Sequence, residues 1–206
     1  LSAAIGPSEA RVLGQPGASA MFRTPQLGRG EELIPLTEAV PAGLGTARIT
    51  LARRAGDVAV TEWWANEPGG LEQGFTVDTR PAGIGPLEVR QTVATSLRAT
   101  LSVAGDALVF ADSVGEQLRF GQPAAWDADG RALPMRLTLE GDTLGFVVND
   151  EAARYPVTID PTWTQKEFLQ ASAGGGSYSL GWSVAIASDL MVVGAPYENS
   201  AAAGVK

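Results

Sequence analysis

The stretch TEWWANEPGGLEQGF contains the residue types best suited to chemistry in this chain. It places Glu62, Glu67 and Glu72 close to two adjacent tryptophans, Trp63 and Trp64. Aromatic rings can serve as platforms for sugar rings, and two carboxyl groups at the right separation hydrolyse glycosidic bonds. The stretch therefore raises two functional hypotheses: a carbohydrate-binding module that uses Trp63 or Trp64, and a hydrolase that uses an acidic pair.

A structural interpretation of the same stretch is simpler, and we favour it. Adjacent residues on a β-strand face opposite sides of the sheet. One of Trp63 and Trp64 is then a core residue and the other lies outside, with Glu72 at an outward polar position. The outward tryptophan remains the alternative ligand platform.

The segment WDADGR raises the question of calcium, because Asp127 and Asp129 stand two residues apart ahead of Gly130. A calcium ion takes six or more oxygen ligands, and the glutamate expected further along an EF-hand loop is missing. We therefore expect a hairpin turn and no cofactor, with calcium at Asp127 and Asp129 as the alternative. Further along, Asp150 and Glu151 ahead of Arg154 predict a polar turn with an exposed ion pair.

Composition restricts the chemistry further. The 206 residues include no Cys and no His, the net charge is −8, and Lys occurs only at Lys166 and Lys206. Without histidine and cysteine there is no Ser-His-Asp or Cys-His mechanism and no thiolate metal site. The acidic balance argues against nucleic acid as a partner. No apolar run approaches the roughly 20 residues of a membrane span. We expect a chain that is not an enzyme.

Hydrophobic residues alternate with a period of two from about Thr46 onward. ARITLAR places Ile49 and Leu51 on one face, and LEQGFTVD does the same for Phe75 and Val77. Strict alternation over short runs bounded by Gly, Asp and Pro is typical of β-strands. Turns are expected at residues 104–106, 127–130 and 140–142. Many short strands at this spacing predict an antiparallel β-sandwich-like domain over residues 46–161.

The flanking segments carry weaker signals. Residues 1–45 are rich in Gly and Pro and predict an irregular leader with short strands, with a single helical turn at Leu33, Leu36 and Val40. Pro156 and Pro161 bracket a four-residue strand. Since proline cannot donate to a β-ladder, that strand is expected at a sheet edge or just before a domain boundary. We place the boundary near Pro161, with a linker over residues 162–177.

The C-terminal residues 178–206 predict a β-hairpin with one apolar face, and a lone hairpin is only marginally stable in water. Such a face needs a cover, which a protein partner or further copies of the chain would supply. The interaction residues predicted on this face are Trp182, Val184, Ile186, Leu190 and Val192.

The sequence LGWSVAIASDLMVVGAPYENSAAAGV in this hairpin resembles an FG-GAP repeat, the blade unit of integrin-type β-propellers. Leu180 and Gly181 stand where the family has Phe-Gly, and residues 194–196 are the Gly-Ala-Pro element. The segment lacks the Asp- and Asn-rich calcium loop that many of these repeats carry. Residues from about Trp63 onward also resemble a module that precedes FG-GAP repeats in large secreted bacterial proteins. The resemblance implies an extracellular or cell-surface location and no particular reaction.

Together these observations predict an all-β chain: an antiparallel β-sandwich-like domain followed by an incomplete β-propeller blade. The expected role is a non-catalytic structural or adhesive module of a secreted or cell-surface bacterial protein. It would act through strand edges and the apolar hairpin. The alternatives are the carbohydrate-binding module and the N-terminal part of a larger enzyme whose active site lies elsewhere. Because the chain begins with Leu1, we expect a processed product or a fragment.

Overall fold

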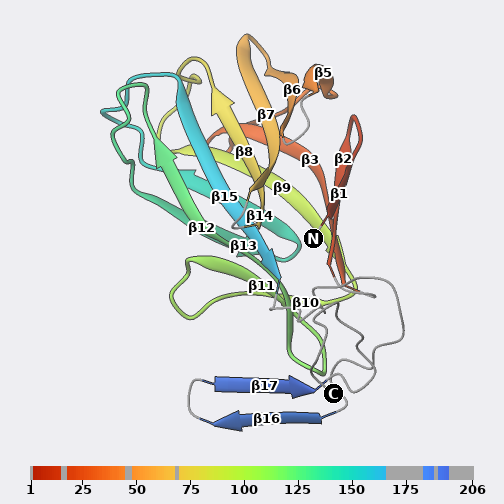
Figure 1. Cartoon of the computed structure of the whole chain (residues 1–206). Helices are drawn as coiled ribbons and strands as arrows, with labels where there is room; N and C mark the ends of the chain where they lie inside the picture. Colours follow the sequence, from red (N-terminus) through yellow and green to blue (C-terminus); the bar gives the residue numbers. More distant parts are fainter. Residues whose placement is uncertain are drawn as a thin grey trace. The chain divides into compact units, whose positions relative to one another are not determined.

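The computed structural model describes residues 2–14, 18–44, 48–67, 70–165, 183–187 and 190–194 (Figure 1). These residues form β-strands, turns and loops and include no helix. The chain divides into two compact units, Leu1–Lys166 and Glu167–Lys206. The all-β prediction is therefore confirmed for the described part of the chain.

The first sheet of the larger unit is antiparallel throughout. It is built from β1 (Ser2–Ile5), β2 (Glu9–Leu13), β3 (Ser19–Arg29), β4 (Glu32–Pro35), β9 (Leu87–Thr95), β13 (Met135–Glu140) and β14 (Thr143–Val148). The strand order is β1-β2-β3-β9-β14-β13, and β4 pairs with β3 off this path. β13 therefore ends the order on one side, and β1 ends it on the other.

The second sheet is also antiparallel. It is built from β5 (Val40–Leu44), β6 (Arg48–Ala55), β7 (Val58–Glu67), β8 (Gly70–Val77), β10 (Arg98–Leu101), β11 (Ala107–Ala111), β12 (Glu116–Trp126) and β15 (Val157–Gln165). The strand order is β10-β11-β12-β15-β8-β7-β6-β5. The last strand of the unit, β15, thus lies between β12 and β8 in the middle of the sheet (Figure 1).

The two sheets pack face to face through aromatic side chains. Phe22 from the first sheet meets Trp163 from the second edge-on, with ring centroids 4.9 Å apart. Phe146 from the first sheet meets Phe120 from the second at 5.7 Å. All four rings are buried in one core cluster with Val, Leu and Ile residues of both sheets. This packing is that of a β-sandwich, as the alternation predicted.

The predicted strand faces and turns are confirmed where the alternation is strict. Leu51, Phe75 and Val77 are buried in the core, and the three expected turns lie between consecutive strands. In the tightest, Glu140 pairs with Thr143 across a two-residue turn. Gly141 has a φ of 62° there, a conformation that a hairpin turn of this length requires and that glycine adopts without steric cost.

Residues 1–45 form more regular structure than predicted. They supply β1 to β4 of the first sheet and β5 of the second, so they are part of the sandwich and no separate leader. No helical turn forms at Leu33, Leu36 and Val40. Leu33 belongs to β4, Leu36 is buried after it, and Val40 begins β5. Pairing with neighbouring strands has overridden the weak local signal of these Gly- and Pro-rich segments.

Several prolines lie inside strands, against expectation. Pro161 is in the middle of β15, which is a central strand of nine residues, and the compact unit continues to Lys166. The register between β12 and β15 shifts between Gly121 and Ala124, opposite Pro161. Pro25 likewise lies at the shift between Arg23 and Gln26 in β3. Such bulges leave a backbone position unpaired, so the missing N–H of proline costs no ladder hydrogen bond.

The close packing of Trp63 on Gly74 gives the first prediction. The two residues are paired across β7 and β8, and a Cβ atom at Gly74 would overlap the six-membered ring of Trp63. We expect Gly74→Ala to lower the free energy of unfolding by about 1–3 kcal/mol in urea titrations, because the added methyl group overpacks the site. The loss should shrink in a Trp63→Leu background. An equal loss in both backgrounds would show that the indole ring is not the cause.

Candidate functional site

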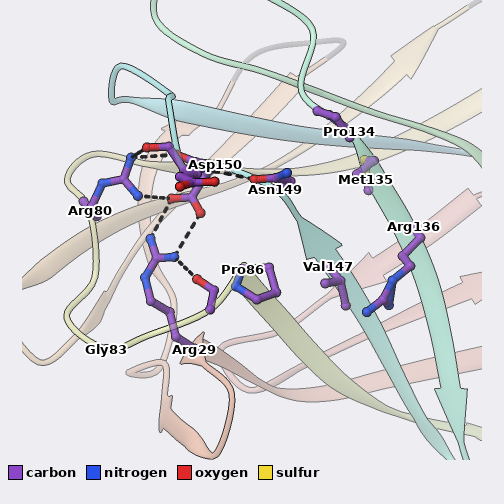
Figure 2. Close-up of a pocket in the computed structure, with 12 residues that line it drawn as sticks. Arg29, Arg80, Gly83, Pro86, Pro134, Met135, Arg136, Val147, Asn149 and Asp150 are labelled. Atoms are coloured by element: carbon purple, nitrogen blue, oxygen red, sulfur yellow. Dashed lines mark hydrogen bonds and ion pairs between the residues drawn. The ribbon is translucent and has the colours of Figure 1, made fainter.

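One cavity of about 680 Å³ lies in the larger unit, beside the starts of β9 and β13 and the end of β14 (Figure 2). Its volume is in the range of small-molecule pockets. The apolar part of its lining consists of Pro86, Pro134, Met135 and Val147. The polar part consists of Arg29, Arg80, Arg136, Asn149, Asp150 and Glu151.

Asp150 is the centre of a buried hydrogen-bond network at one end of the cavity. Its side chain is 1% exposed and accepts two hydrogen bonds from Arg29, at 2.9 and 2.6 Å. Arg80 donates at 3.0 Å, the Tyr155 hydroxyl at 2.5 Å and the Leu87 backbone N–H at 3.2 Å. Figure 2 shows Arg29 and Arg80 converging on Asp150 from two different segments of the chain.

The network also fixes the loop after β8. Arg29 donates from Nε to the Pro81 carbonyl at 3.0 Å and from Nη1 to the Gly85 carbonyl at 2.5 Å. Arg80 donates from Nη2 to the Asp150 carbonyl at 2.6 Å. Each nitrogen of the Arg29 guanidinium is thus engaged within the protein. Arg29 holds the loop in place and has no donor left for a ligand.

The electrostatics keep Asp150 ionised. Burial alone would raise its pKa, but hydrogen bonds from Arg29 and Tyr155 and the positive charges of Arg29 and Arg80 outweigh burial and lower the pKa. The pKa of Tyr155 is strongly raised, first by burial and then by its hydrogen bond to the Asp150 carboxylate. The hydroxyl therefore stays protonated and donates. A carboxylate with this many donors is a structural anion and is poorly suited to act as a catalytic acid or base.

The sequence interpretation missed this network. An exposed ion pair of Asp150 or Glu151 with Arg154 was expected, whereas Asp150 is buried and pairs with Arg29 and Arg80. Arg154 instead pairs with Asp129. The partners of Asp150 lie 121 and 70 residues away along the chain, so no local spacing could have indicated them.

Replacing the central anion gives the second prediction. We expect Asp150→Asn to lower the free energy of unfolding at neutral pH by about 3–5 kcal/mol, because it leaves the buried Arg29 cation without its counter-charge. Denaturant titrations of the variant and the wild type measure this difference. Because the Asp150 pKa is lowered in the folded protein, the stabilisation exists above the ordinary aspartate pKa and should disappear as pH falls.

Asp129→Asn is the matched control. Asp129 and Arg154 form an exposed ion pair, which should contribute no more than about 1 kcal/mol. If both substitutions cost the same, the buried network does not stabilise the fold as described.

Asp127, the first of the two calcium candidates, organises the turn after β12. Its Oδ1 accepts hydrogen bonds from the backbone N–H groups of Asp129 and Arg131, both at 3.0 Å. Its Oδ2 accepts from the Arg154 N–H at 3.3 Å and lies 3.2 Å from the Arg131 guanidinium. Asp129 pairs with Arg154 at 2.6 Å. Both carboxylates already have protein donors. The predicted turn forms and is closed by an isolated bridge between Trp126 and Ala132, but it joins β12 of the second sheet to β13 of the first, so it is not a hairpin between paired strands.

The described residues hold no group of three Asp, Glu, His or Cys side chains arranged to bind a metal ion. Calcium at Asp127 and Asp129 would have to displace the backbone N–H groups and the two arginines. Calcium at these two residues stays a prediction.

Trp63 and Trp64 face opposite sides of the second sheet, as predicted, but neither is exposed. Trp64 is in the core cluster, 2% exposed, and its Nε1 donates to Glu62 Oε1 at 2.9 Å. Glu62 is itself buried and accepts from Arg53 Nε at 2.6 Å. Trp63 is on the other face, 3% exposed, with the Arg48 guanidinium 4.0 Å from its ring centroid. The expected exposed platform is wrong, because Gly74 lets the ring lie flat on the sheet and Arg48 covers it.

Two carboxyl groups with raised pKa values lie on the outer face of the second sheet. Burial and the nearby charge of Glu72 raise the pKa of Asp160 to about 6, with a smaller contribution from Glu67. Burial and the charge of Glu67 raise the pKa of Glu72, and Arg48 opposes both shifts. Asp160 Oδ1 has no hydrogen-bond partner among the described residues. These acidic side chains are not among the residues that line the cavity.

The raised pKa of Asp160 gives the third prediction. The folded protein binds the Asp160 proton more tightly than the unfolded chain does, so stability is lost as pH rises from 3.8 through 6. Asp160→Asn removes this loss. We expect the free energy of unfolding of the variant, relative to that of the wild type, to rise by about 1–2 kcal/mol from pH 4 to pH 8, allowing for the partial exposure of the group. Urea titrations at both pH values measure it, and a difference independent of pH would contradict it.

The smaller unit contains one described hairpin, a two-stranded sheet of β16 (Ser183–Ala187) and β17 (Leu190–Gly194). The antiparallel register pairs Val184 with Val193 and Ala185 with Val192. Directly opposed residues share a face of a sheet. Val184 and Val192 therefore occupy positions on opposite faces.

Ile186 pairs with Met191 and Leu190 pairs with Ala187, so Ile186 and Leu190 also occupy positions on opposite faces. The four residues predicted to share one apolar face therefore lie at positions on two faces, Val184 and Ile186 on one, Leu190 and Val192 on the other. Trp182, the fifth predicted interaction residue, lies outside the described residues. An interaction role for these residues stays a prediction.

The fold and the hairpin define an all-β protein with a sandwich unit and a separate β-hairpin unit. Residues 163–205 match the FG-GAP repeat, which confirms the resemblance for that part of the chain. The match begins at Trp163, inside β15 of the sandwich. An FG-GAP repeat suggests a β-rich protein-interaction module. A search of the curated proteins finds no match. The described residues contain no helix capable of crossing a membrane.

Proposed function

We propose that this chain is a non-catalytic interaction module of a secreted or cell-surface protein, with a structural or adhesive role. The sandwich is its rigid part, and the hairpin β16–β17 is its contact element. One observation carries the proposal: beyond β15, the described part of the FG-GAP match is the two-stranded sheet of β16 and β17, whereas a propeller blade has four strands.

The physics of β-sheets supports this role for the hairpin. Among the described residues, β16 and β17 pair only with each other. An isolated two-stranded hairpin is marginal in water, and its open edges present backbone groups to which another strand can bond. Strands of further FG-GAP repeats, on a longer polypeptide or on another copy of the chain, are complementary partners for these edges.

The state of the candidate catalytic groups supports a non-catalytic role. Asp150 and Asp127 are saturated with protein donors, and Glu62 is held by Arg53 and Trp64. The carbohydrate-binding alternative lacks the exposed tryptophan on which it depended. Glu72 and Asp160 have raised pKa values but are not among the residues that line the cavity. A parent enzyme with its active site on other repeats would use this chain in the same non-catalytic way.

Hydrogen exchange across a concentration series tests the proposal and is the fourth prediction. In a dilute monomer, we expect the amides of β16 and β17 to exchange much faster than those of β8, because a hairpin without neighbours opens readily. They should become protected as concentration rises or when a polypeptide of consecutive FG-GAP repeats is added. Val184→Asp should weaken this protection, whereas Val103→Asp, at a fully exposed site in the sandwich, should not.

Full protection of β16 and β17 in the most dilute monomer would contradict the proposal. The hairpin would then be stable without any partner strand. The melting temperature of the sandwich in both variants serves as the folding control, since neither substitution touches its core.

A further inference from the structure

The cavity has a second end, away from Asp150, that the buried network does not use. Pro86, Met135 and Val147 give it an apolar lining, and Arg136 lies beside Val147 on the neighbouring strand (Figure 2). Ile84 is 94% exposed between Gly83 and Gly85, both of which line the cavity. An apolar recess with an exposed isoleucine next to its rim is typical of a binding surface.

The charges at the cavity favour an anion. The Arg29 and Asp150 charges offset each other, which leaves Arg80 and Arg136 against Glu151. Arg80 has already committed hydrogen bonds to Asp150 and to backbone carbonyls. The Arg136 side chain is exposed and forms no hydrogen bond or ion pair with any described residue, whereas its backbone belongs to the β13–β14 ladder. The cavity is therefore a locally positive site on a chain whose net charge is −8.

The position of the cavity favours a peptide over a small anion. β13 ends the strand order of the first sheet, so in the described structure no strand pairs with its outer side. Its first residues, Met135 and Arg136, line the cavity together with Pro134. An extended segment that paired with this edge would run beside Met135 and Arg136 at the rim of the recess, with one side chain directed to the side of Arg136 and the next to the opposite side.

From this arrangement we propose that the cavity binds an extended acidic segment of a protein partner along β13. One carboxylate of the segment pairs with the Arg136 guanidinium, and the adjacent apolar side chain, directed to the opposite side of the sheet, packs against Met135. The inference shares with the proposed function only the class of partner, because it concerns a surface of the sandwich and not the hairpin.

The test uses the full chain and a panel of fluorescein-labelled eight-residue peptides of alternating Val and Thr, each with one central Glu at a different position. Binding is measured by fluorescence anisotropy at low and moderate salt. We expect saturable binding by at least one peptide that weakens about tenfold or more when its Glu is replaced by Gln, because a charge-assisted pair is lost. Free acetate should not compete at comparable concentrations.

Variants locate the site. Arg136→Gln should weaken binding about tenfold, since it removes the unpaired guanidinium. Arg98→Gln is the matched control, because Arg98 is also exposed at the start of an edge strand, in the other sheet. The affinity of the Arg98→Gln variant for the peptide should equal that of the wild type. Failure of the whole panel to bind would overturn the inference. Equal losses of affinity in both variants would also overturn it, because they would show a general effect of charge and no specific site.

A hairpin variant separates this inference from the proposed function. Val184→Asp should leave peptide binding unchanged, since β16 belongs to the other compact unit. If Val184→Asp abolishes binding while Arg136→Gln does not, the peptide binds the hairpin. The cavity inference would then fail while the proposed role of the hairpin stands.

Discussion

The burial of Trp163 between the two sheets is the interaction on which the rest of the structure depends. Its ring stacks on Phe120 at 4.2 Å and on Phe110 at 5.7 Å within the second sheet, and it meets Phe22 of the first sheet edge-on. Burying an aromatic ring of this size is among the largest single contributions available to a core. Because Trp163 is carried by β15, the sandwich is completed only by its last strand. The FG-GAP match begins at this same residue, so the sandwich core and the start of the repeat share one strand.

Buried charge imposes the second constraint. Two ion pairs, Arg29 with Asp150 and Arg53 with Glu62, are almost fully removed from water, and each carboxylate accepts further hydrogen bonds. Desolvation makes such pairs expensive, so they persist only where nearly every lone pair and proton is satisfied. Asp160 is the opposite case, with an unpartnered oxygen and a raised pKa. The two paired carboxylates therefore help to hold loops in place, whereas the Asp160 carboxylate lowers the stability of the fold.

Local patterns predicted those features that depend on local physics. Strict alternation located core positions such as Phe75 and Val77, and glycines and aspartates located the turns, because both signals act over a few residues. Features decided by distant partners were missed. Pro161 was taken to end a strand, but a bulge in β12 accommodates it. The prediction that Trp63 and Trp64 face opposite sides of the sheet was right. The expected exposure of one of them was wrong, because Gly74 and Arg48 determine how Trp63 is buried. Asp150 could not be singled out, because its arginines come from elsewhere in the chain.

The central claim is that the sandwich is complete once β15 is in place, and that the hairpin is a separate unit devoted to contacts. The most direct test is a calorimetric comparison of the full chain with a chain truncated after Lys166, the end of the first compact unit. The account predicts that the truncated chain unfolds in one cooperative transition at the melting temperature of the sandwich in the full chain. A loss of cooperativity, or a large fall in melting temperature, would show that the sandwich requires the repeat and would contradict the account.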